Sequence, residues 1–324
     1  MKKIRQWLEE TAWALGPDLV LLAVFSLLLA VCMVAFHGSF SILHASTIMP
    51  CVGMLVLLAA SFVPRWRGIL HDDPGVRREV RRVAWATTRD WFPLVLILLV
   101  YGNFHDLTHL IHPETVDATL QRADQAVFGF QPALVMQAIT RPWLTEYMTF
   151  AYALFFVFPA ILLVRLYARG DLLAFRELSL ALSLCFYLGL VGYLTVPAIG
   201  PRYTMDFDVP LTGYWMTDAC ARMWLAIEKV QTDCFPSLHT AVSTISLVYF
   251  ARLRAWRFGR AILVLVTPLV ISLWMSTIYL RYHYGVDVLA GWALAALCVT
   301  VAPAVVQTNY RKRDARSLAA LPSP

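Results

Sequence analysis

The chain has 324 residues, of which 59% are hydrophobic and 15% charged, with a mean hydropathy of +0.63 and a formal net charge of +6. Soluble domains are about half apolar and about a quarter charged, so this composition excludes a soluble enzyme and a disordered chain. The apolar residues form long runs, and the Lys and Arg residues lie in short clusters between them. This arrangement predicts a multi-pass membrane protein and argues against a nucleic-acid partner.

A helix needs roughly 20 apolar residues to cross about 30 Å of hydrocarbon. On this criterion we expect one all-α membrane domain, a helix bundle of about eight transmembrane spans, of which the third and sixth are short. Six or seven spans remain possible if one of the first three lies along the interface. The predicted spans are 18–36, 46–64, 91–105, 147–168, 177–197, 238–251, 261–280 and 286–307.

Positive charges favour the cytoplasmic side of a membrane. With the amino end placed inside, only six of the 27 Lys and Arg residues fall outside: Arg122, Arg141, Arg202, Arg222, Lys229 and Arg281. Both termini are therefore expected in the cytoplasm, together with the charge-rich connection 65–90 and the tail 309–324. The segments 106–146 and 198–237 are expected on the outer face.

The two outer segments differ in pattern. In the first, the apolar spacing of VDATLQRADQAVFGFQP predicts a helix that lies along the membrane surface. The second is rich in aromatic residues, Asp, Pro and Gly and is expected to be irregular. The chain thus divides into N-terminal spans (1–105), an interfacial segment (106–146), a core (147–308) and a tail.

The segment CFPSLHTA opens the sixth predicted span. Pro236 suits the first turn of a helix because its missing N–H is no loss there. Ser237 and His239 then lie in a turn whose free N–H groups can meet an anion. A capped helix with an interfacial histidine is the structural alternative.

The segment STIYLRYHYGVDVLAG leads into the eighth predicted span. Its His283 and Asp287 are four residues apart, so on a helix they share one face. The carboxylate can accept the proton of one imidazole nitrogen and leave the other nitrogen free as a nucleophile. A polar pair that packs against a neighbouring helix is the alternative.

Arg202 lies in VPAIGPRY, also on the outer face, where its guanidinium can bind a phosphate or extend toward lipid head groups. Together the three segments favour transfer of an anionic phosphoryl group through one histidine, with acid–base help from the other. An activated Ser or Cys motif for acyl transfer is absent. The lack of a carboxylate cluster argues against a magnesium-dependent mechanism.

The order PSLH followed by H-x3-D resembles the second and third signatures of the type 2 phosphatidic acid phosphatase superfamily. CFPSLHTA and RYHYGVDVLAG are most similar to its inositol phosphorylceramide synthase (inositolphosphotransferase) branch and the bacterial relatives of that branch. The resemblance covers about 197–291, and ADQAVFGFQP extends it toward 120. It implies a six-helix phosphatase-type core within the bundle, a phosphohistidine intermediate and no cofactor or metal.

The same resemblance assigns roles to individual residues. It makes His283 the nucleophile, Asp287 the residue that orients it, and His239 the general acid that protonates the leaving alkoxide. Ser237 and Arg202 are expected to hold the phosphoryl oxygens.

Two departures from the superfamily pattern favour the inositol-transfer branch, which shares them. Thr277 stands after Ser276 where the third signature usually has Arg, and the usual Lys-x6-Arg-Pro signature is absent. Arg281 is therefore a second candidate cation for the phosphate, beside Arg202.

The acceptor is left open by these residues. With water as acceptor, the protein would be a lipid phosphate or polyprenyl pyrophosphate phosphatase. With inositol or a lipid hydroxyl, it would transfer a phospho-head group between membrane lipids at the non-cytoplasmic face, and the resemblance favours transfer. A non-catalytic lipid-binding or transport protein on the same fold is the alternative from another class.

Other polar residues have several interpretations. His105, His109 and His112 could ligate a metal, contact substrate or bond nearby loops; we expect substrate contact for the first two rather than a metal. Asp117 and Asp124 are expected to be solvated or capping, with a polyol contact by Asp124 as a further possibility. In an oxidising compartment, Cys220 could pair with Cys234.

Overall fold

The computed structural model describes residues 16–35, 74–103, 108, 111–112, 114–227, 232–256 and 258–319. Within these residues the chain is helical, and its extended pairing is limited to an isolated bridge between Ala198 and Asp233. The all-α prediction is therefore confirmed for this part of the chain.

Among the described residues, four helices are long and apolar enough to cross a membrane: α8 (Pro142–Ala168), α9 (Leu172–Thr195), α13 (Gly259–Tyr279) and α14 (Gly285–Ala319). They coincide with the predicted fourth, fifth, seventh and eighth spans. On α13, Val264 and Leu265 are 75% and 66% exposed, as expected for side chains that meet lipid rather than water. Helix α14 continues into the predicted tail, beyond the predicted end of its span at 307.

Three further helices complete the bundle: α2 (Pro17–Ala35), α4 (Pro74–Asn103) and α12 (Leu238–Arg252), which is followed by the short η2 (Leu253–Ala255). Helix α12 has 15 residues, about 22 Å at about 1.5 Å per residue, so it is shorter than the hydrocarbon core. It nevertheless lies at the centre, packed against α8, α9, α13 and α14. The predicted span 46–64 lies outside the described residues, so the count of about eight spans stays a prediction.

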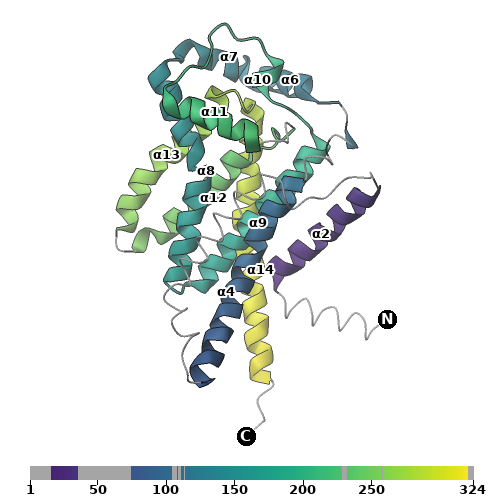
Figure 1. Cartoon of the computed structure of the whole chain (residues 1–324), viewed down its shortest axis with the longest axis vertical. Coiled ribbons are helices and arrows are strands. Elements are labelled where there is room, and N and C mark those ends of the chain that lie inside the picture. The colour runs from purple at the N-terminus through teal and green to yellow at the C-terminus, as the bar shows by residue number, and fades with distance from the viewer. Residues whose placement is uncertain are drawn as a thin grey trace.

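Short helices gather at one end of the bundle, here called the site end (Figure 1). They are α6 (Asp117–Phe128), α7 (Pro132–Met136) with η1 (Gln137–Ile139), α10 (Pro201–Thr204) and α11 (Trp215–Ile227). A helix was expected in the first outer segment and is found there. The expectation that 198–237 is irregular is wrong for α10 and α11.

Helix α11 forms because α8 supplies partners for its first turn. The Glu146 carboxylate accepts hydrogen bonds from the backbone N–H groups of Tyr214, Met216 and Thr217, at 2.7–3.0 Å, and from the Thr217 hydroxyl at 2.6 Å. These N–H groups would otherwise have no partner inside the helix. The capping residue lies some 70 positions earlier in the chain, so local sequence could not indicate it.

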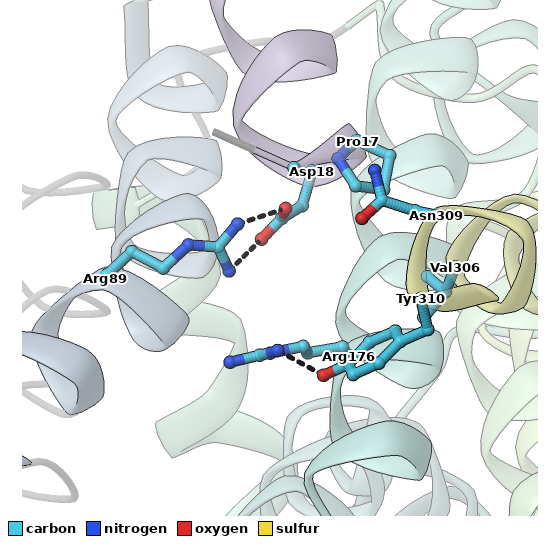
Figure 2. Close-up of a pocket in the computed structure, with 8 residues that line it drawn as sticks. Pro17, Asp18, Arg89, Arg176, Val306, Asn309 and Tyr310 are labelled. Atoms are coloured by element: carbon cyan, nitrogen blue, oxygen red, sulfur yellow. Dashed lines mark hydrogen bonds and ion pairs between the residues drawn. The ribbon is translucent and has the colours of Figure 1, made fainter. Parts of the chain in front are cut away.

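A cluster of charged and polar side chains lies at the opposite end of the bundle and is called here the far-end cluster (Figure 2). Its Tyr310 is about 38 Å along α14 from Gly285, at about 1.5 Å per residue. Asp18 accepts two hydrogen bonds from Arg89, at 2.8 and 3.0 Å, and Asp90 pairs with Arg176 at 3.0 Å and Arg89 at 3.1 Å. Arg176 also contacts the Tyr310 hydroxyl. The end of the charge-rich segment 65–90 is thus part of the packed bundle, because Asp90 is only 2% exposed and its charge is paired.

Candidate active site

The structure brings the two predicted histidines together at the site end. His239 lies in the first turn of α12, and His283 lies two residues before α14. Their ring centroids are 5.9 Å apart, with the ring planes inclined by 56°. Because α12 packs against α14, residues far apart in the chain meet in one place, close enough for both rings to contact one phosphate group.

Ser237 holds the start of α12. Its hydroxyl accepts hydrogen bonds from the Thr240 backbone N–H at 3.3 Å and the Thr240 hydroxyl at 3.1 Å, and its own N–H donates to the Asp287 carbonyl at 3.2 Å. The side chain is fully buried. The structure therefore shows the capping alternative for Ser237, and the phosphate contact through its hydroxyl stays a prediction.

The His283 ring has two acceptors near its Nδ1 atom. The Cys234 carbonyl oxygen lies at 2.8 Å and the nearer Asp287 carboxylate oxygen, Oδ2, at 3.5 Å. A carbonyl oxygen only accepts, so this contact assigns the ring proton to Nδ1 and leaves Nε2 without one. The shorter contact is thus the one to the Cys234 carbonyl, which makes the hydrogen bond, and the predicted orienting role of Asp287 stays a prediction.

Asp287 is itself fixed by its neighbours. Its Oδ2 atom accepts from the Tyr284 backbone N–H at 2.7 Å and from the Cys234 thiol at 2.9 Å. Within the described part of the chain, its Oδ1 atom is buried and has no hydrogen-bond partner. Cys234 therefore contacts both members of the pair, His283 through its carbonyl and Asp287 through its thiol.

The predicted pairing of Cys220 with Cys234 is not formed, because both cysteines are free. Cys220 packs beside Tyr152 and Leu280, whereas Cys234 packs with Leu120 and Ala198 in a different cluster. Burial, reinforced by the Asp287 carboxylate, raises the pKa of the Cys234 thiol well above its ordinary value. The thiol therefore stays protonated and is the donor of the hydrogen bond to Asp287.

His239 is held by aromatic rings from α8. Its ring stacks on Tyr152 with centroids 4.0 Å apart, and Phe155 lies at 4.2 Å. The Tyr152 hydroxyl lies 3.3 Å from His239 Nδ1, and the His239 Nε2 atom is buried without a hydrogen-bond partner among the described residues. Tyr152 was not among the predicted site residues, because no motif in its local sequence indicates a contact with His239.

Two arginines lie in the turns around the histidine pair, Arg202 in contact with Tyr282 and Arg281 two residues before His283. Arg202 is exposed, and its guanidinium donates to the Tyr282 hydroxyl at 2.9 Å. Arg281 is 8% exposed; its guanidinium lies 3.8 Å from the Phe207 ring centroid and donates to the Val209 carbonyl. Tyr282, which stacks on Tyr152 with centroids 4.9 Å apart, links Arg202 to the ring that holds His239.

The two cations also affect each other. Their backbones are joined by a 2.8 Å hydrogen bond from the Arg202 N–H to the Arg281 carbonyl. Burial, followed by the repulsion of Arg202, lowers the pKa of the Arg281 guanidinium. Within the described residues neither arginine forms an ion pair with a carboxylate. A bound anion would relieve this repulsion, so the pair suits a phosphate.

Asp124 positions the start of α14. It is 1% exposed, and its two oxygens accept from the backbone N–H groups of Gly285 at 2.9 Å and Val286 at 2.8 Å. Burial raises the pKa of this carboxyl, against the opposing effect of the two N–H donors. Asp124 is therefore a buried capping residue and not a solvated one, whereas the polyol contact stays a prediction.

Asp117, two turns earlier on α6, likewise accepts hydrogen bonds from backbone N–H groups just before α10. Its carboxylate accepts from Ile199 N–H at 3.1 Å, Gly200 N–H at 2.9 Å and the Tyr284 hydroxyl at 2.9 Å. Gly200 has a φ of 87°, and a β-carbon there would lie 2.5 Å from the Tyr282 carbonyl, so only glycine fits. Helix α6 thus fixes both the turn that carries Arg202 and the turn that carries His283.

The remaining predicted site residues are the three histidines of the segment NFHDLTHLIHP. His105 and His109 lie outside the described residues, and His112 is exposed. Among the described residues, the side chains that could share a metal ion are Cys234, His283 and Asp287.

Comparison with known proteins places the chain in a family. The model of the PAP2 superfamily matches residues 118–301. Because the match covers more than half of the chain, the protein belongs to the PAP2 superfamily, and it is an integral membrane member of it. The resemblance seen in the PSLH and H-x3-D signatures is therefore confirmed.

A curated relative points to one branch of this family. The protein named inositol phosphorylceramide synthase in Candida albicans (strain SC5314 / ATCC MYA-2876) is 26% identical to this chain over 224 residues. The aligned part covers 64% of this chain and 46% of the relative, so the chain matches less than half of that protein's length. No solved structure matches this chain significantly.

Proposed function

We propose that this protein is a membrane phospholipid phosphotransferase that acts through a phosphohistidine at His283. The observation that carries the proposal is the pair of imidazole rings, 5.9 Å apart, with the Nδ1 atom of His283 held by a carbonyl and a carboxylate. An imidazole that keeps its proton on Nδ1 presents a free Nε2 lone pair, which is the nucleophile that covalent phosphoryl transfer needs.

The proposed reaction has two half-reactions. In the first, Nε2 of His283 attacks the phosphorus of a phospholipid, and His239 donates a proton to the oxygen that leaves. In the second, His239 takes the proton from an acceptor hydroxyl, which attacks the phosphohistidine and frees His283. Arg202 and Arg281 stabilise the negative oxygens in both steps.

The acceptor is proposed to be an alcohol, so that a phospho-head group of the inositol-phosphate type passes between lipids. The relative whose name is inositol phosphorylceramide synthase supports this choice. Hydrolysis by water would use the same phosphohistidine, so a lipid phosphate phosphatase is the alternative outcome of the experiment.

The decisive experiment uses the full chain in vesicles with phospholipid that carries a labelled phospho-inositol head group, with and without ceramide. Transfer predicts labelled inositol phosphorylceramide, whereas hydrolysis predicts released inositol phosphate that does not depend on ceramide. Replacement His283→Ala or His239→Ala should lower turnover by at least about 10³-fold. His112→Ala, which replaces an exposed histidine that is not part of the pair, is the matched control. Full turnover in either site variant would contradict the mechanism and favour a non-catalytic lipid-binding or transport protein.

Metal independence is part of the proposal, because two imidazoles and two guanidinium groups can together provide the nucleophile, the acid and the charge stabilisation. Turnover should therefore not fall when a chelator is present. A loss that added Mg²⁺ restores would point instead to a metal-dependent hydrolase.

We propose that the site end faces the outer leaflet, with both termini in the cytoplasm. The distribution of Lys and Arg along the sequence supports this orientation. A reporter that is active only in the cytoplasm should therefore be active when it is fused to the carboxyl terminus. Trp215 at the site end is 76% exposed, so a fluorophore attached to a Trp215→Cys variant should be quenched only by a membrane-impermeant quencher added on the outer side.

A further inference from the structure

Three potential metal ligands lie together beside the His283 ring: the Cys234 thiol, the His283 Nδ1 atom and the Asp287 carboxylate. Their ligand atoms all lie within 4.8 Å of one another, and the three residues are buried. The thiol sulfur is 2.9 Å from Asp287 Oδ2, and the His283 Nδ1 atom is 3.5 Å from the same oxygen. These atoms come from the segment before α12 and the first residues around the start of α14.

Two of the three separations are close to those of tetrahedral coordination, and metal binding has to displace the Cys234 carbonyl from His283 Nδ1. Zinc bonds of about 2.0–2.3 Å place neighbouring ligand atoms about 3.3–3.6 Å apart. The nitrogen–oxygen separation already matches, and the sulfur–oxygen separation has to widen by about 0.6 Å. The Asp287 Oδ1 atom, buried and without a hydrogen-bond partner in the described part of the chain, is a further oxygen available to the ion.

The chemistry of the three groups selects the class of metal. A sulfur, a nitrogen and an oxygen ligand suit Zn²⁺ and similar borderline divalent ions, whereas Mg²⁺ and Ca²⁺ prefer oxygen alone. A thiolate and a carboxylate also cancel the charge of a divalent ion. The resulting neutral complex is the form that a buried site tolerates best.

We propose that Cys234, His283 and Asp287 form an inhibitory site for Zn²⁺ or a similar thiophilic divalent cation. On binding, the Cys234 thiol loses its proton to solvent and the sulfur bonds to the metal. The single proton of the neutral His283 ring moves from Nδ1 to Nε2, because Nδ1 gives its lone pair to the metal.

Inhibition follows from this change of tautomer. With the proton on Nε2, His283 has no free lone pair directed at a phosphorus atom and cannot act as nucleophile. At the same time the Asp287 carboxylate is bonded to the metal and can no longer stabilise positive charge on the His283 ring. This inhibitory consequence rests on the proposed function, whereas metal binding itself does not.

Binding is tested on the purified full chain with Co²⁺, which reports thiolate ligation through a sulfur-to-cobalt charge-transfer absorption band. The band is expected at one equivalent of Co²⁺ in the wild type and in Cys220→Ala, the control for the other cysteine of the 198–237 segment. It should be absent in Cys234→Ala and in Cys234→Ser, which keeps a hydrogen-bond donor for Asp287. Wild-type protein without the band, or a band that persists in both Cys234 variants, overturns the proposal.

Inhibition is tested in the lipid assay by titration with Zn²⁺. The wild type and Cys220→Ala should be inhibited, with reversal by a chelator, and the residual activity of Cys234→Ser should need about 10- to 100-fold more Zn²⁺. Equal sensitivity of the wild type and Cys234→Ser would overturn the inhibitory role. If the wild type turns over no lipid at all, the proposed function fails, and the cobalt band still decides the metal site.

Discussion

The two ends of the bundle use the same residue types in opposite ways. In the far-end cluster, the Arg89 and Arg176 side chains pair with Asp18 and Asp90. At the site end, Asp117 and Asp124 accept hydrogen bonds from the backbone and a tyrosine. Arg202 and Arg281 therefore have no carboxylate partner among the described residues.

This difference separates a structural cluster from a binding site. An arginine that is matched by a carboxylate has little charge left for a ligand, and its loss is felt as stability. An arginine whose carboxylate neighbours are occupied by backbone groups keeps its charge for an anion. Counting charged residues in the sequence does not distinguish the two cases, because the pairing decides.

The largest effect is expected from Asp287→Asn at the site end. The amide keeps the shape of the side chain but removes the charge that stabilises His283 when it becomes cationic or phosphorylated. Turnover should fall by on the order of 10³- to 10⁴-fold, while the thermal unfolding temperature in detergent stays close to that of the wild type. A variant with near-normal turnover would show that the Cys234 carbonyl alone orients the ring.

Arg202→Gln is expected to have the next largest effect on activity. The variant keeps a hydrogen-bond donor toward Tyr282 but loses the charge, so turnover should fall about 10²-fold, whereas folding should not change. Arg89→Gln at the far end is the matched control, with the reverse expectation of reduced stability and normal turnover. Equal loss of activity in both variants would contradict the distinction between a phosphate-binding arginine at the site end and a structural arginine at the far end.

Asp124→Ala tests the positioning of the turn that carries His283. It leaves the N–H groups of buried Gly285 and half-buried Val286 without their acceptor, which should destabilise the protein by about 2 kcal/mol. Because the start of α14 moves with them, a moderate loss of turnover should accompany the lower unfolding temperature. Asp124→Asn, whose amide oxygen can still accept, should recover most of both losses.

The smallest effect is expected from Asp18→Asn at the far end. It removes the charge opposite Arg89, which retains Asp90 at 3.1 Å, so the loss should be on the order of 1 kcal/mol in stability. Turnover and its dependence on lipid concentration should match the wild type. An altered lipid dependence would show that the far-end cluster communicates with the site.

Much of the functional core could be predicted from the sequence, because its signals are local. The four-residue spacing of His283 and Asp287 and the PSLH turn with His239 are short patterns, and the apolar runs give the four long helices. Tyr282, the first of the two tyrosines of RYHYGVD, was within reach of the same reasoning, because both adjoin His283.

The supporting residues could not be predicted in this way. Tyr152 reaches His239 across 87 positions of sequence, and Glu146 reaches the first turn of α11 across about 70. The incorrect pairing of Cys220 with Cys234 has the same origin, since closeness in sequence did not reveal that the two side chains pack in different clusters.

The sequence by itself determined that this is a helical membrane protein of the PAP2 superfamily, and which histidines and which aspartate to expect at its centre. Only the tertiary structure decided which carboxylates pair with arginines and which cap the backbone, since that choice depends on contacts such as Asp124 with Gly285, 161 positions apart. Hydropathy and spacing describe one segment at a time. The free charge of Arg202 and Arg281, the thiol beside Asp287 and the proton on His283 Nδ1 are properties of several segments packed together.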